Sequence, residues 1–324
     1  MKAIRVEAAG GPEVLRIADV PDPVAGPTEA IVRIEAIGVN FIEVYQRSGL
    51  YPMQMPMTPG GEAAGTVISI GAETTTSRIK VGDRVAWQGA PGAYAEMAKV
   101  PADKLVKIPD EVSTDQAAAV MLQGMTAHYL ATSTYQLKSD DTCLFHAAAG
   151  GVGLLFCQIA SHIGARVIGT TSTDEKAALA KEAGAWKIID YTKQDFPVEV
   201  RRLTNGAGVP VAYDSVGKTT WEKTIDSLSP LGMAVFFGNS SGPVPPIDPL
   251  MLMRKGSLFM TRPTLNHYVA SRNDLLLRAN AVLNAVASGN LKVRIEKTFP
   301  LVEAAAAHTL LESRKTAGKI LLKP

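Results

Sequence analysis

The stretch FHAAAGGVG, residues 145–153, joins an apolar strand-like run to an apolar helix-like run. Ala147, Gly150 and Gly153 follow the spacing A-x-x-G-x-x-G, and Phe156 stands where the third glycine of the usual G-x-G-x-x-G would fall. In a strand–turn–helix, glycines let the backbone approach a pyrophosphate, toward which the first helical amides point with partial positive charge. Close packing of the helix on the strand also requires glycine, so the turn alone leaves both interpretations open.

The segments around this turn alternate between strand-like and helix-like from Thr142 to about Pro263. Six mostly continuous apolar runs are typical of parallel strands buried on both faces: TCLFHA, ARVIGTT, AWKIIDY, VPVAYDSV, GMAVFFG and GSLFMTR. Helical segments between them include LLFCQIASHIG, STDEKAALAKEAG and TTWEKTIDSLSP. The pattern predicts an α/β fold with a Rossmann doubly wound parallel sheet. A glycine turn at the first strand–helix junction of such a sheet favours a dinucleotide.

The first 110 residues are instead rich in short β-branched runs separated by turn signals such as GG, PDP and VGD. About 50 residues at the other end predict a long helix, a strand, a second helix and a final strand. Such a tail can pack back on the β-rich first part. We therefore expect residues 1–122 and 264–324 to form one domain and residues 123–263 to form the dinucleotide-binding domain.

The end of the second predicted strand indicates which dinucleotide is bound. NAD sites usually carry an acid there for the ribose 2′-hydroxyl, but this chain has TTST at 170–173. The next acids, Asp174 and Glu175, come later in the sequence. Ser172 and Glu175 fit a capping box, which places both acids in the first turn of the following helix. A 2′-phosphate is then not repelled, and Thr171, Ser172 and Lys176 can donate to it. We expect NADPH rather than NADH, with a solvated helix lysine as the alternative for Lys176.

Small and hydroxyl-bearing residues follow the later strands, and ligands of open parallel sheets sit beyond this carboxyl edge. DSVG ends the fourth strand and GNSSG the fifth, although plain loops use the same residues. Tyr191, at the end of the third strand, is expected on the adenine side. The residues expected to line the cofactor on these loops are Ala149, Gly150, Gly151, Val152, Tyr191, Ser215, Phe237, Gly238, Asn239 and Ser240.

Charge and cysteine content exclude several classes of protein. The 33 basic and 31 acidic side chains nearly cancel, so no global basic field favours nucleic acid or an anionic membrane. No apolar run reaches the length of a transmembrane helix, and the first residues lack a signal-peptide pattern. Cys143 and Cys157 lie in apolar runs, which indicates buried free thiols in a reducing compartment. We expect a cytoplasmic protein that binds neither nucleic acid nor membrane.

The whole arrangement resembles the medium-chain dehydrogenase/reductase superfamily over essentially the full chain. More narrowly, the segments NFIEVYQRSGLYP, GGEAAGTV, FHAAAGGVG, YDSVG, FFGNSSG and TRPTL resemble the zeta-crystallin-type quinone oxidoreductases. This resemblance implies that the β-rich part is a GroES-like catalytic domain. It also implies a homodimer formed through the edge strand of the nucleotide domain, here GSLFMTR.

The resemblance draws attention to absent metal ligands. Zinc alcohol dehydrogenases of the superfamily carry a cysteine where Asn40 stands and a histidine where the GGE motif has Gly61, and Gln123 lies near another ligand position. Catalytic zinc needs about three protein ligands, so we expect no metal site. A quinone or enone needs less Lewis-acid help than an alcohol, because charge spreads through its π system.

The resemblance implies that NADPH reduces a quinone to the semiquinone or hydroquinone. It places Asn40, Tyr45 and Tyr51 around the nicotinamide and the substrate, with Asn40 bonding the cofactor and the phenols orienting or protonating a quinone oxygen. Alternatively, Asn40 is only a turn residue, and Tyr45 and Tyr51 are only partly buried aromatic residues. Further cofactor contacts are expected from Gln123, Gly124, Thr126, Arg262, Arg314 and Lys319. Arg314 and Lys319 are equally compatible with surface charges.

Two other functions stay open. The same scaffold can reduce the carbon–carbon double bond of an enone or enoyl substrate with NADPH. Zeta-crystallin relatives also include lens structural proteins and RNA binders, so a nucleotide-regulated binding or structural protein is the non-enzymatic alternative. The near-neutral charge argues against RNA.

Overall fold

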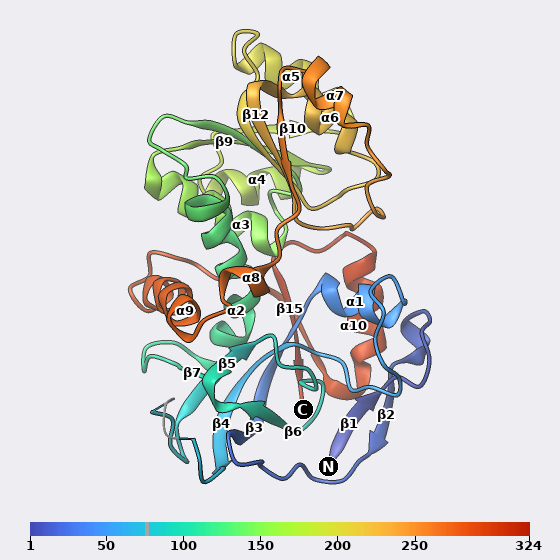
Figure 1. Cartoon of the computed structure of the whole chain (residues 1–324), viewed down its shortest axis with the longest axis vertical. Coiled ribbons are helices and arrows are strands. Elements are labelled where there is room, and N and C mark those ends of the chain that lie inside the picture. The colour runs from blue at the N-terminus through green and yellow to red at the C-terminus, as the bar shows by residue number, and fades with distance from the viewer. Residues whose placement is uncertain (75–77) are drawn as a thin grey trace. The chain divides into compact units, whose positions relative to one another are not determined.

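Figure 1 shows the computed structural model of the chain, which describes residues 1–74 and 78–324. The chain divides into two compact units. The first unit comprises Met1–Met125 and Val269–Pro324, and the second comprises Thr126–Tyr268. The first unit is therefore assembled from two segments of sequence with the second unit inserted between them.

The second unit is built on a six-stranded parallel sheet with the order β10-β9-β8-β11-β12-β13. Its strands are β8 (Thr142–Phe145), β9 (Arg166–Thr171), β10 (Lys187–Asp190), β11 (Val209–Asp214), β12 (Leu228–Phe236) and β13 (Phe259–Thr261). The strand order reverses between β8 and β11, which is the switch point where doubly wound folds bind ligands. The predicted α/β class and doubly wound sheet are confirmed.

Six helices accompany these strands, and three of them were not predicted. They are α3 (Gly151–Ile163), α4 (Asp174–Glu182), α5 (Phe196–Leu203), α6 (Trp221–Asp226), α7 (Pro249–Arg254) and α8 (Leu265–Tyr268). The unpredicted helices, α5, α7 and α8, are short, and α5 and α7 each carry a proline in the first turn. The capping box predicted at Ser172 and Glu175 is wrong. The N-cap of α4 is Thr173, whose hydroxyl accepts a bond from Lys176 N at 3.2 Å, because β9 runs on to Thr171.

The first unit contains a seven-stranded sheet, in which β6 pairs with β3 beside the path β14-β15-β3-β4-β5-β7. Its strands are β3 (Glu29–Val39), β4 (Glu62–Ile70), β5 (Arg84–Gln88), β6 (Met97–Pro101), β7 (Val106–Lys107), β14 (Ile295–Pro300) and β15 (Lys319–Lys323), and a separate pair is formed by β1 (Lys2–Arg5) and β2 (Arg16–Asp19). The predicted return of the tail to the β-rich part is confirmed, since β15 pairs antiparallel with β3.

Strand register in this sheet brings distant polar residues together. Ile320 pairs with Val39 across β15 and β3, which sets Lys319 beside the end of β3. On the other side of β3, Ile37 pairs with Ala63 of β4, which sets Glu62 at the same level. The residue that follows β3 is Asn40, so three polar residues from three segments meet at one edge of the sheet.

The first unit contains α1 (Phe41–Arg47), α9 (Arg272–Ala287), α10 (Ala304–Glu312) and most of α2 (Thr114–Tyr129), and α1 lies beside α10 (Figure 1). The sequence did not predict α1, because seven residues are too few to display a helical repeat. Among residues 1–74 and 78–324, no helix combines the length and the apolar composition needed to cross a bilayer.

Candidate functional site

The glycine turn, residues 146–153, connects β8 to α3 in the second unit. Gly150 is the N-cap of α3, with φ −71° and ψ 171°, and this position provides no side-chain cap for the helix. The turn is held by Gly150 N donating to Ala147 O at 2.8 Å and by Ala148 N donating to Thr170 O at 3.1 Å. Ala147 adopts the left-handed conformation with φ 54°. The predicted residues Ala149, Gly150, Gly151 and Val152 thus all lie in this turn or the first turn of α3.

The glycines of the turn are needed for different reasons. A Cβ at Gly153 would lie 2.4 Å from Ala147 O and 2.6 Å from Ala148 O, so the fold itself excludes a side chain there. A Cβ at Gly150 would meet Ala147 O at 3.1 Å and otherwise only the Ala147 methyl at 3.9 Å. Internal packing therefore requires Gly153 much more than Gly150. The open space at Gly150, at an uncapped helix N-terminus, fits the approach of a pyrophosphate.

The residues predicted to select NADPH lie at the ends of β9 and β10. Thr171 is 3% exposed and its hydroxyl is buried without a hydrogen-bond partner in the structure. Lys176 is half-buried in the first turn of α4, after Ser172. Tyr191 is 51% exposed, and its amide donates to Thr171 O at 3.1 Å, which joins the two strand ends. The acids Asp174 and Glu175 are in the first turn of α4, as expected.

The loops after β11 and β12 are tied to each other. Ser240 N donates to Ser215 O at 3.1 Å, and Phe237 N donates to Asp214 O at 2.8 Å. A Cβ at Gly238 would lie 2.6 Å from Ser215 O, so this glycine permits the close approach of the two loops. Ser215 in the first of these loops and residues 237–240 in the second therefore lie side by side at the carboxyl edge of the sheet.

A buried series of hydrogen-bonded polar side chains, which the sequence did not predict, supports this edge of the sheet. Thr224 Oγ1 and Thr220 Oγ1 each donate to Asp214 Oδ2 at 2.7 Å, and His146 contacts Thr224 Oγ1 and Thr170 Oγ1 at 3.0 Å each. Burial lowers the pKa of His146, partly offset by Asp214, so the imidazole is neutral. Since the Thr224 hydroxyl proton goes to Asp214, His146 donates from Nε2 and accepts from Thr170 at Nδ1.

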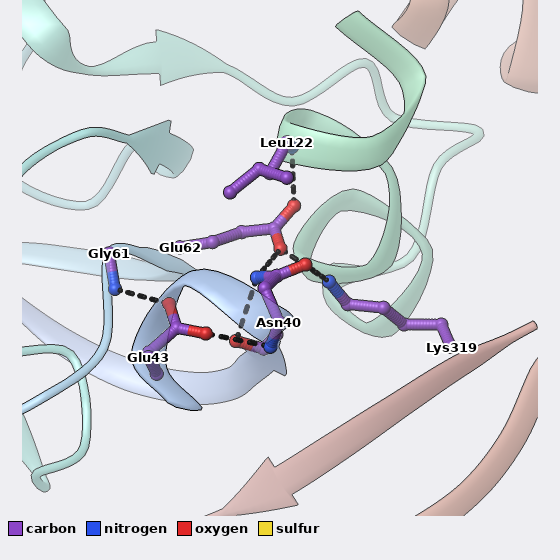
Figure 2. A network of polar contacts seen from close by, with 7 residues as sticks. Asn40, Glu43, Gly61, Glu62, Leu122 and Lys319 are labelled. Carbon is purple, nitrogen blue, oxygen red and sulfur yellow. Dashed lines mark hydrogen bonds and ion pairs between the residues drawn. The ribbon is translucent and has the colours of Figure 1, made fainter. Parts of the chain in front are cut away.

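The first unit holds a second candidate site, shown in Figure 2, which we call the polar network: Asn40, Glu43, Glu62 and Lys319 with the amides of Gly61 and Leu122. Lys319 Nζ lies 2.6 Å from Asn40 Oδ1 and 2.6 Å from Glu62 Oε2. Asn40 Nδ2 donates to Glu62 Oε2 at 2.8 Å and to Gly38 O at 3.3 Å. Leu122 N donates to the other oxygen, Glu62 Oε1, at 2.6 Å. The Lys319 and Glu62 side chains are 1% and 0% exposed, so the suggestion that Lys319 is a surface charge is wrong.

Glu43 completes the polar network from α1. Asn40 N donates to Glu43 Oε2 at 2.7 Å, and Gly61 N donates to Glu43 Oε1 at 3.2 Å. Burial raises the pKa of Glu43 to about 7, an effect that the Lys319 ammonium opposes and the Glu62 carboxylate increases. Neither Glu43 nor Glu62 was predicted from the sequence as a site residue. N-x-x-E at 40–43 is a capping-box spacing that signals Glu43, and Glu62 is the one charged residue in the otherwise small and apolar run GGEAAGTV.

The two predicted tyrosines, Tyr45 and Tyr51, follow Asn40 and Glu43 in the sequence and form an aromatic pair. The rings of Tyr45 and Tyr51 are edge-to-face, with their centroids 5.2 Å apart. The ring centroid of Phe41 lies 6.1 Å from that of Tyr45. Tyr51 N donates to Tyr45 O at 2.9 Å, so the backbone also fixes the pair. Tyr45 is buried on α1, whereas Tyr51 is half-buried in the loop that follows α1.

The remaining predicted residues have varied surroundings. Gln123, Gly124 and Thr126 lie in α2, where a Cβ at Gly124 would meet Val282 Cγ1 of α9 at 2.5 Å, so helix packing accounts for this glycine. Arg262 is exposed and donates to Pro263 O at 3.0 Å. Arg314 is exposed in the left-handed conformation, with φ 57°. These geometries leave the predicted cofactor contacts of Gln123, Thr126, Arg262 and Arg314 as predictions.

The donor groups at the polar network do not suit zinc. The Asn40 amide is already bonded to a carboxylate and an ammonium, and Gly61 contributes only a backbone amide, which bonds Glu43. Within the described ranges 1–74 and 78–324, no three His, Cys, Asp or Glu side chains are grouped so as to hold a metal ion. The residues present therefore do not fit the metal site of the zinc alcohol dehydrogenases.

Comparison with known proteins covers the whole chain. Residues 26–110 match the family model of the alcohol dehydrogenase GroES-like domain, and residues 151–272 match that of the zinc-binding dehydrogenases. The chain is 48% identical to a quinone oxidoreductase of Pseudomonas aeruginosa over 100% of this chain and 99% of the relative. It is 42% identical to a 2-haloacrylate reductase of a Burkholderia species, with 98% of each protein covered. The crystal structure of Escherichia coli quinone oxidoreductase complexed with NADPH matches with a TM-score of 0.97 and 44% identity over 100% of both chains.

Proposed function

The chain belongs to the quinone oxidoreductases of the medium-chain dehydrogenase/reductase superfamily, and on this basis we propose that it is an NADPH-dependent quinone reductase that works without a metal ion. The observation that carries the proposal is the polar network. The positions that hold zinc ligands in the alcohol dehydrogenases are an asparagine locked between Lys319 and Glu62 and a glycine. A site without a Lewis acid suits an acceptor whose own π system spreads the developing charge.

The second unit supplies the cofactor site in this proposal. The uncapped N-terminus of α3 and the space at Gly150 accept the pyrophosphate. The unsatisfied hydroxyl of Thr171 and the ammonium of Lys176 donate to the 2′-phosphate, in a position where NAD-specific proteins carry an acid. When bound, NADPH supplies the reducing equivalents. The protein supplies binding, orientation and exclusion of water.

The first unit supplies the substrate-facing groups in this proposal. The phenols of Tyr45 and Tyr51 orient the quinone by hydrogen bonds to its oxygens, and the edge-to-face contact of their rings limits the positions that these groups sample. The Asn40 carbonyl oxygen retains acceptor capacity beyond its bond to Lys319, because a carbonyl has two lone pairs. Its two amide hydrogens already have protein acceptors, so we propose that Asn40 meets the nicotinamide through Oδ1.

The test is to follow NADPH absorbance with 1,4-benzoquinone, 9,10-phenanthrenequinone and an enone in parallel, each with and without a metal chelator. We expect oxidation of NADPH with the quinones, unchanged by the chelator. Tight NADPH binding without oxidation by any acceptor would contradict the enzymatic proposal. It would favour a nucleotide-regulated binding or structural protein instead.

Reduction of an activated carbon–carbon double bond is a second candidate. It is favoured by the Burkholderia relative named 2-haloacrylate reductase, which is 42% identical over nearly the whole chain. Haloacrylates and enones share with quinones a double bond conjugated to a carbonyl. A ratio of kcat/KM that favours the enone over both quinones in the same assay would establish this alternative.

We further propose that two copies pair through β13, joining their sheets. The support is an open sheet edge with exposed apolar side chains: Phe259 and Met260 of β13 are 57% and 41% exposed, and the neighbouring Leu231 is 67% exposed. Such an edge favours pairing with another strand. We also propose a reducing, cytoplasmic location, because Cys143 and Cys157 are buried free thiols and burial raises the pKa of Cys157 to about 12.

A further inference from the structure

We propose that the buried ion pair of Lys319 and Glu62 is a positioning device that locks the Asn40 amide and the middle of α2 into one arrangement. This inference rests on the proposed function, because it assigns these residues to the support of the Asn40 site. Neither residue of the pair is assigned a role in contacting substrate. Their effect is transmitted through the groups that they hold.

The ion pair fixes the orientation of the Asn40 amide. Its oxygen faces the Lys319 ammonium at 2.6 Å and its nitrogen faces the Glu62 carboxylate at 2.8 Å. Rotating the amide by half a turn would set its NH₂ against an ammonium and its oxygen against a carboxylate. Both contacts would then be repulsive in a buried site, where charge-assisted bonds are stronger than in water. One orientation is therefore strongly preferred.

Glu62 also holds the backbone of α2. The Leu122 amide, in the interior of this helix, donates to Glu62 Oε1 at 2.6 Å. The next residues are Gln123 and Gly124, which are predicted to contact the cofactor. A single carboxylate thus holds the Asn40 amide with one oxygen and the backbone of α2 with the other.

The fold keeps space for the Glu62 carboxylate. A Cβ at Gly38 would lie 2.2 Å from Glu62 Oε2 and 2.6 Å from Ala118 O of α2. Gly38 pairs with Leu321 in the middle of the sheet, where a side chain would otherwise contribute packing. The absence of a side chain at residue 38 is therefore matched to the position of Glu62 between β3 and α2.

The test separates positioning from plain structural support by comparing single and double variants. Lys319→Met or Glu62→Gln alone leaves one buried charge uncompensated and is expected to lower the melting temperature. The double variant removes both charges, so its melting temperature is expected to recover. Its kcat is expected to stay roughly 100-fold below wild type, because small displacements of positioned groups cost about this much. Lys323→Met is the matched control on the same strand, since Lys323 pairs with the half-exposed Asp115.

A double variant that recovers kcat together with its melting temperature would overturn the proposal, because the pair would then only stabilise the fold. A second readout does not depend on activity. Hydrogen exchange of the Asn40 side-chain amide, followed by NMR, is expected to be slow in wild type and Lys323→Met and at least tenfold faster in the double variant. Equal exchange rates in all variants would also overturn it. Loss of quinone reduction in the wild type, with slow Asn40 exchange intact, would instead contradict the proposed function alone.

Discussion

The ammonium nitrogen of Lys319 lies 2.6 Å from Glu62 Oε2, and the two side chains are 1% and 0% exposed. They are 257 positions apart in the sequence. Burial of such a pair costs desolvation free energy, which is offset only when other bonds also satisfy the charges. Here the carboxylate also accepts from Asn40 and Leu122, and the ammonium also bonds Asn40. A change in any one member therefore alters the electrostatic environment of the others.

The protonation of Glu43 is the first measurable consequence. Burial raises the pKa of this carboxyl from its ordinary value of 4.5 to about 7. Because the folded state holds the proton more tightly, the stabilisation from Glu43 is full below pH 4.5 and is lost as pH rises through about 7. The difference in unfolding free energy between wild type and Glu43→Gln is expected to fall by about 1.4 kcal/mol per pH unit inside this window. Urea denaturation at a series of pH values measures it.

The neighbours of Glu43 provide controls of opposite sign. The Lys319 ammonium lowers the Glu43 pKa and the Glu62 carboxylate raises it. Lys319→Met is thus expected to move the midpoint of the Glu43 titration above about 7. Glu62→Gln is expected to move this midpoint below about 7. Midpoints that stay unchanged in both variants would show that the three groups are not coupled.

Cofactor preference gives a second prediction. We expect NADPH to bind roughly tenfold more tightly than NADH, or better, because Thr171 and Lys176 offer a donor and a cation where an acid would repel the 2′-phosphate. Lys176→Ala is expected to narrow the difference in affinity between NADPH and NADH, because it weakens NADPH binding and leaves NADH binding unchanged. Fluorescence titration with both nucleotides measures this, and equal affinities in the wild type would refute the argument.

Gly150 and Gly153 of the glycine turn are expected to respond differently to alanine, which is the third prediction. Gly153→Ala forces a methyl against two carbonyl oxygens, at 2.4 and 2.6 Å, and is expected to cost about 1–3 kcal/mol of stability. Gly150→Ala meets nothing closer than 3.1 Å and is expected to change stability by less than about 1 kcal/mol. It is nevertheless expected to weaken NADPH binding at least tenfold, because its methyl occupies the approach to the pyrophosphate. Thermal melts and titrations of both variants distinguish packing from binding; normal NADPH affinity in Gly150→Ala would contradict the assignment.

Tyr51→Phe is the fourth prediction. The variant keeps the ring that packs edge-to-face on Tyr45 and removes only the hydroxyl. If the phenol orients or protonates the quinone, kcat is expected to fall roughly 100-fold, with the melting temperature nearly unchanged. Tyr45→Phe is the parallel variant on α1. Wild-type kcat in both variants would remove the tyrosines from the proposed mechanism.

Pairing through β13 is the fifth prediction. Phe259→Lys places a charge on the exposed edge strand and is expected to convert a dimer to a monomer. Analytical ultracentrifugation gives the mass of each species. Val198→Lys, at a 60% exposed position on α5, is the matched control and is expected to stay dimeric. A monomeric wild type would refute the interface.

The fold was accessible from the sequence because its signals are local. The apolar runs that became β8 to β12 are continuous, and the glycine turn marks the first strand–helix junction. The polar network was not accessible, since Lys319 and Glu62 meet only through the register of β15 on β3 and of β3 on β4. The cap of α4 was placed one residue early because Ser172 and Thr173 are both competent caps, and the choice depends on where β9 ends.

The insertion of the second unit between Glu62 and Lys319 has a consequence for biosynthesis. Domains generally fold as the chain emerges from the ribosome, with the earlier segments first. When residue 268 has been synthesised, the second unit is complete, but the first unit still lacks β15. Residues 37–39 of β3 then have no partner on that side, and Glu62 has no ammonium to neutralise it. The nascent protein can therefore have a finished second unit before it has a finished first unit.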